Sequence, residues 1–200
     1  MISIPELDQN IKKELGSFFS TQAHQEPDRI RYINSSVKDL CMKRDWDFNK
    51  FRDTITVTTV NTQTVMKTVL KTYHVYDSAG IPMEVLNFED YYQRQSESDT
   101  EWYVWVWGNT FQAPETGTYV ITYSALPEPI TSLTGNLDIP SDKQDLIVVI
   151  AVYYAFMDLR MYDKAGEKRA IAKGMTEDIA QRSTDPTPRQ IGRMWGSYQF

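Results

Sequence analysis

The chain has 200 residues, of which 41% are hydrophobic, 24% charged and 12% aromatic, a composition that excludes a disordered chain. This length fits one domain, or a domain with an insertion, and leaves no room for a second full catalytic domain. Lys and Arg number 21 against 27 Asp and Glu, a net charge of −6, which disfavours sequence-specific binding of duplex DNA because such binding neutralises phosphates with positive charge.

The sequence requires neither an oxidising compartment nor a membrane. Cys41 is the single cysteine, so no internal disulfide can form. The longest apolar run, residues 146–157, is shorter than the roughly 20 residues that cross a bilayer, and residues 1–8 do not resemble a secretion signal. We therefore expect synthesis in the cytoplasm and no membrane partner.

Two helices are predicted in the first quarter of the chain. Apolar residues recur at spacings of three and four over residues 6–19 and again over residues 28–44, which draws one apolar stripe along each segment. Asp28, which follows Pro27, is a suitable N-cap for the second helix.

The pattern changes at residue 54 to alternating β-branched side chains, which predicts strands with one buried face. A helical turn is expected within residues 87–94. The short Gly- and Pro-containing segment 109–117 predicts that the strands on either side of it pair as a hairpin. The expected strands cover residues 54–60, 65–76, 83–86, 102–107 and 118–123.

Two further helices are predicted after Pro127 and Pro129. Ser141 and Gln144 have the spacing of a capping box, and the run 146–157 that follows is apolar nearly all round, which predicts a central helix. A charged helix continues to about residue 182. We expect Val149, Ala151, Val152, Ala155 and Phe156 of the central helix to pack against Ile33, Val37 and Leu40.

These elements predict an α+β fold. The N- and C-terminal helices form one bundle, and a small antiparallel β domain is inserted between the second and third helices. The expected boundaries are residues 1–53 and 127–182 for the bundle, 54–126 for the β domain, and 183–200 for an extended C-terminal arm.

The sequence offers no convincing catalytic motif, and no enzyme activity is predicted. His24 and His74 have no Cys or acidic residue at zinc-like spacing, so no metal site is expected. Without a Gly-rich phosphate loop, a nucleophile elbow or an HExxH motif, no cofactor is expected either. Glu97, Asp99 and Glu101 could act as paired carboxylates, but this run is polar on every side, which favours a solvated loop.

One predicted strand carries Trp102, Trp105 and Trp107. Exposed aromatic side chains on a strand can stack on sugar rings or on single-stranded bases. No basic residue lies between residues 95 and 112, which favours a strand that is covered by the core, the helices or a neighbouring subunit. A subunit or tail interface is therefore predicted at these tryptophans.

The C-terminal arm has the composition of a binding segment. Beyond a proline-containing break it combines apolar anchors with two arginines, and Gly192 and Gly196 favour an extended conformation over a long helix. The alternative is that it folds back on its own helices. The candidate binding residues are Arg189, Ile191, Arg193, Met194, Trp195, Tyr198 and Phe200.

The order and spacing of several motifs resemble the head-to-tail adaptor proteins of tailed bacteriophages, including the tubular tail protein A group. The resemblance covers most of residues 30–182. The motifs include Ile33-Asn34-Ser35-Ser36-Val37, Trp46-Asp47-Phe48, Trp107-Gly108-Asn109-Thr110-Phe111-Gln112-Ala113-Pro114, Thr118-Tyr119-Val120-Ile121-Thr122-Tyr123, Leu133-Thr134, Ile139-Pro140, Asp145-Leu146-Ile147 and Tyr162-Asp163-Lys164-Ala165.

This resemblance implies a structural virion protein at the head–tail junction. Such adaptors form an oligomeric ring, typically twelve-fold, that binds the portal protein through the C-terminal arm and a tail or nozzle protein on the other side. The genome passes through the ring, and an acidic net charge agrees with passage without sequence-specific binding. Two alternatives stay open: a carbohydrate- or receptor-binding module that uses the tryptophan strand, and a hydrolase that uses the acidic run.

Overall fold

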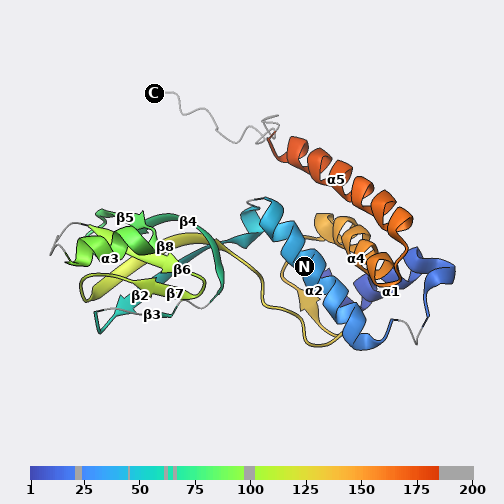
Figure 1. Ribbon diagram of the computed structural model, residues 1–200, viewed down its shortest axis with the longest axis horizontal. Helices are drawn as coiled ribbons and strands as arrows, with labels where there is room; N and C mark the ends of the chain where they lie inside the picture. The colour runs from blue at the N-terminus through green and yellow to red at the C-terminus, as the bar shows by residue number, and fades with distance from the viewer. Residues whose placement is uncertain (21–23, 45, 61–62, 65–66, 97–101, 185–200) are drawn as a thin grey trace, which may run out of the picture.

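A computed structural model shows an elongated α+β molecule in which a helical bundle and a β domain lie side by side along the long axis (Figure 1). The predicted α+β class is confirmed. Two chain segments connect the parts, one after the second helix and one after the last long strand. The structure describes residues 1–20, 24–44, 46–60, 63–64, 67–96 and 102–184.

The bundle is built around α4, which contacts the other three helices. Within the described residues no helix is long and apolar enough to cross a membrane; α4 is apolar nearly all round because neighbouring helices cover it. The predicted core is confirmed: Ala151, Val152, Ala155 and Phe156 are buried in one cluster with Ile33, Val37 and Leu40, and Val149 is partly buried against it. The bundle helices are α1 (Ile4–Leu15), α2 (Glu26–Lys43), α4 (Gln144–Asp158) and α5 (Tyr162–Thr184).

The start of α2 differs from the prediction. The helix begins at Glu26 with Pro27 in its first turn and Gln25 at the N-cap position, so Asp28 is not the cap. The fixed φ of proline suits the first turn of a helix, which moves the start of the helix ahead of Asp28. A 3-10 turn, Gly16–Phe18, follows α1, where Gly16 has a φ of +53°.

The predicted capping box is also wrong. Residues Ser141–Lys143 form a 3-10 turn, and Lys143 occupies the N-cap position of α4 without a side-chain hydrogen bond to the helix. Just before this turn, the short strands β1 (Ile2–Ser3) and β9 (Asn136–Leu137) pair antiparallel. This pairing ties the N-terminus of the chain to the segment that leads into α4.

The β domain holds one curled sheet with the strand order β2-β8-β4-β5-β6-β7-β3. Its own core includes Ile55, Val75, Phe111 and Ile121. The last strand, β3, contacts the first, β2, so the sheet nearly closes on itself. The strands are β2 (Lys50–Val57), β3 (Gln63–Thr64), β4 (Val69–Tyr76), β5 (Pro82–Leu86), β6 (Tyr103–Trp107), β7 (Thr110–Gln112) and β8 (Gly117–Ala125).

The predicted hairpin between the tryptophan strand and the strand near residue 120 is wrong. Instead, β6 turns back immediately at Gly108 and pairs with β7, while β8 pairs with β2 and β4. Gly108 has a φ of +57°, and a two-residue loop with glycine in its first position is a strong hairpin signal. One pair, β5 with β6, is parallel; α3 (Phe88–Ser96) makes the crossover that a parallel pair requires.

Candidate functional site

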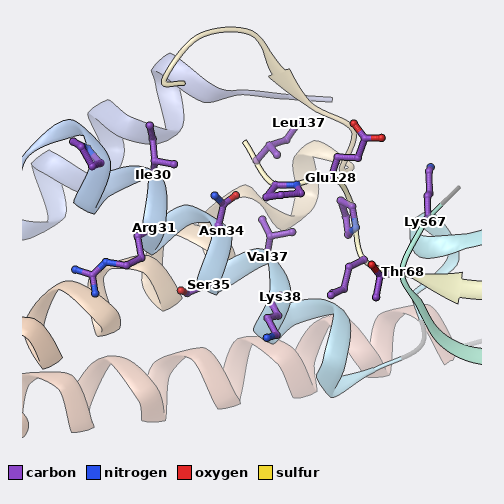
Figure 2. Close-up of a pocket in the computed structure, with 14 residues that line it drawn as sticks. Ile30, Arg31, Asn34, Ser35, Val37, Lys38, Lys67, Thr68, Glu128 and Leu137 are labelled. Atoms are coloured by element: carbon purple, nitrogen blue, oxygen red, sulfur yellow. The ribbon is translucent and has the colours of Figure 1, made fainter. Parts of the chain in front are cut away.

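A groove of about 600 Å³ lies where the bundle meets the β domain. One wall is α2 and the other is the crossover segment, residues 126–135, which joins β8 to β9 (Figure 2). Lys67 and Thr68, which precede β4, lie at one end of the groove. The lining combines apolar side chains with three cations and one acid: Ile30, Val37, Leu126, Pro127 and Leu137, with Arg31, Lys38, Lys67 and Glu128.

Asn34 holds the two walls of the groove together. Its Nδ2 donates a hydrogen bond to the backbone oxygen of Ile130, and the Ile130 N–H donates one to its Oδ1, both at 2.9 Å. The Leu126 N–H also donates to the Thr68 oxygen at 3.1 Å. The groove is therefore fixed by hydrogen bonds between distant segments.

The cations of the groove differ in their partners. Arg31 pairs with Asp158 and with Asp28, and the hydrogen bond to Asp158 raises the pKa of Arg31 above its ordinary value. Lys67 Nζ lies 3.5 Å from the centre of the Phe51 ring, a cation–π contact. Lys38 is exposed on α2. The groove thus keeps positive charge at Lys38 and Lys67.

A second surface, the aromatic face, consists of Phe88, Tyr92, Trp105 and Trp107. Phe88 lies 4.6 Å from Tyr92 and 5.5 Å from Trp105 between ring centres. Trp105 and Trp107 are two residues apart on β6 and therefore share one side of the sheet. Trp107 is 74% exposed and Phe88 is 56% exposed, which is unusual for such large apolar side chains.

The structure separates Trp102 from the other two tryptophans. Trp102 precedes β6 and lines a different cavity, of about 140 Å³, with Asp77 and Pro114. The predicted interface therefore divides into the pair Trp105 and Trp107, and a separate Trp102.

The aromatic face owes its geometry to α3. Asn87 caps this helix, because the Asp90 N–H donates to Asn87 Oδ1 at 2.9 Å and Asn87 Nδ2 donates to the Asp90 carboxylate at 2.6 Å. Tyr91 packs edge-on against Tyr103 on β6, and burial raises the pKa of Tyr91 to about 12. Sequence reasoning missed Phe88 and Tyr92, although their spacing of four residues places both on one side of a helix.

Several predicted site residues lie outside the described residues. These include the acidic run Glu97, Asp99 and Glu101. They also include the candidate arm residues Arg189, Ile191, Arg193, Met194, Trp195, Tyr198 and Phe200.

In the part of the chain that the structure describes, no group of three or more His, Cys, Asp or Glu side chains could hold a metal ion. Burial raises the pKa of the Cys41 thiol to about 11 and that of Tyr154 to about 12. The hydrogen bond from Lys50 lowers the pKa of Asp47. All three shifts lead away from neutrality, so these groups keep their usual protonation state at pH 7.

A bundle with an inserted β domain is the architecture that the resemblance to phage head-to-tail adaptors implies. A comparison with protein families agrees: the model of the SU10 adaptor protein family matches residues 5–195. Because the match spans nearly the whole chain, the chain belongs to the SU10 adaptor protein family, and the predicted resemblance is confirmed. Membership makes it a bacteriophage adaptor and a component of the virion. No curated protein matches the chain.

Proposed function

We propose that the chain forms a ring beneath the portal protein at the head–tail junction, joins the capsid to a tail or nozzle protein, and leaves a channel for the genome. Twelve copies are the expected stoichiometry. The observation that carries this proposal is the family match over residues 5–195, which includes the bundle, the β domain and most of the arm.

The architecture supports a molecule with two contact regions. The bundle and the β domain each have a separate hydrophobic core, so each part can present its own surface to a neighbour. α5 of the bundle ends at Thr184, two residues into the segment that we predict as the arm. We assign portal binding to Arg189, Ile191, Arg193, Met194, Trp195, Tyr198 and Phe200.

The charge of the chain supports passage of DNA through the ring. A net charge of −6 disfavours retention of the genome by counterion release and agrees with its passage. Catalysis forms no part of this function.

The exposure of Trp107 and Phe88 favours a second candidate function, the binding of a carbohydrate or receptor by stacking on the aromatic face. Mass photometry of the purified full chain separates the two functions. An adaptor gives particles of many subunits, alone or after portal is added. A carbohydrate-binding module stays a monomer or a small oligomer, and its tryptophan fluorescence changes when glycans are added.

A further inference from the structure

We propose that the aromatic face of one copy docks into the groove of the next copy, and that repetition of this contact closes the ring. The inference rests on the proposed ring and names the two surfaces that build it. Both surfaces are accessible in a single copy: the aromatic face carries exposed aromatic side chains, and the groove is an open, largely apolar cavity.

The two surfaces carry opposite charge. Glu89 and Asp90 are exposed next to Phe88, in the first turn of α3. The groove has Lys38 and Lys67 against Glu128, while its third cation, Arg31, is already paired with Asp158 and Asp28. Complementary charge at the rim of an apolar contact selects the partner and its orientation. The aromatic side chains of one copy then fill the groove of the next, as aromatic anchors do at the centre of protein interfaces.

The end of β6 that carries Trp107 lies on the groove side of the β domain, whereas α3 lies farther from the bundle (Figure 1). The Val69 N–H donates to the Gly108 oxygen at 2.7 Å, and Gly108 directly follows Trp107 on the aromatic face. Lys67 and Thr68, which line the groove, directly precede Val69. This hydrogen bond fixes the position of the end of β6 relative to the groove within one copy.

The contact joins two different surfaces, so each copy keeps one free surface after pairing. Such a heterologous contact adds further copies and closes into a ring when the rotation permits, whereas a contact of one surface with itself stops at a dimer. The ring planes of Phe88 with Tyr92 and of Phe88 with Trp105 are inclined by 51° and 68°. The side chains of Phe88, Tyr92 and Trp105 therefore do not form one flat platform for a sugar, which favours the protein partner.

Two variants of the full chain test this contact. The face variant combines Trp107→Ser with Glu89→Gln, and the groove variant combines Lys38→Glu with Lys67→Glu. Circular dichroism and thermal melting verify that each variant is folded. In mass photometry we expect each variant alone to be monomeric, with at least a tenfold loss of rings relative to the unmodified chain. An equal mixture should give dimers and no rings, because each mixed pair has only one intact contact.

A matched control reverses two exposed lysines outside both surfaces, Lys13→Glu with Lys173→Glu, and should keep the rings. Rings in both surface variants would overturn the inference and leave the proposed function standing. Loss of rings in only one variant, or no dimers in the mixture, would also overturn it. If the face variant still forms rings, and the tryptophan fluorescence of the unmodified chain changes when glycans are added, the aromatic face binds carbohydrate instead. If the unmodified chain forms no ring with or without portal, the proposed function fails as well.

Discussion

Asn34 joins two segments that lie almost a hundred residues apart in the chain. Ile130 lies in an irregular segment, where its backbone groups have no partner from a helix or a sheet. The Asn34 side chain hydrogen-bonds both the N–H and the oxygen of Ile130 at 2.9 Å. Asn34→Ala leaves both backbone groups without this partner. We expect the free energy of unfolding to fall by about 1–3 kcal/mol in urea titration. Ser35→Ala, on the same helix, is the control and should change it by less than about 0.5 kcal/mol. Equal effects of the two variants would contradict the role given to Asn34.

Buried protonated groups set the behaviour of the protein at high pH. The pKa of Cys41 rises from an ordinary 9.0 to about 11 and that of Tyr154 from 10.0 to about 12, in both cases chiefly through burial. Because the folded pKa lies above the unfolded one, their contribution to stability is complete below about pH 9 and is lost as the pH rises through 11 and 12. We expect the melting temperature to fall across that window, and less steeply in Tyr154→Phe. An unchanged slope in this variant would show that Tyr154 does not contribute.

The C-terminal arm is the element with the most direct functional prediction. The bundle core is built from α1, α2, α4 and α5, so deletion of residues 192–200 should change the melting temperature by less than about 2 °C. We expect the shortened protein to stay folded and to lose portal binding in a pull-down with purified portal, because Met194, Trp195 and Phe200 supply the apolar anchors. Double substitution of Arg189 and Arg193 by alanine should weaken binding less. An unfolded shortened protein, or one that binds portal normally, would refute the assignment.

Helices were more predictable than strand pairing, for a physical reason. The run that forms α4 is apolar over its whole length, and only a helix covered by other helices satisfies such a run. Strand partners depend on turns. The two-residue loop at Gly108 and Asn109 pairs β6 with β7, so β6 does not pair with β8, which follows the longer segment after β7. The start of α2 was misplaced because Pro27 belongs inside the first turn.

The candidate surfaces were only partly predictable. The separation of Trp102 from Trp105 and Trp107 follows from the two-residue period of a strand, so the sequence contained that signal. The groove could not be foreseen, because its walls come from α2, from residues before β4 and from the crossover segment. No local pattern states which of these distant segments pack together.

At the scale of the whole molecule, the chain is a phage adaptor, and the central proposal is that it builds a ring that stacks on the portal. Negative-stain imaging of the purified full chain, alone and mixed with portal protein, tests this claim most directly. We predict rings with an open centre, coaxial with the portal in the mixture. Monomers or small oligomers that leave the portal bare in the mixture would contradict the claim.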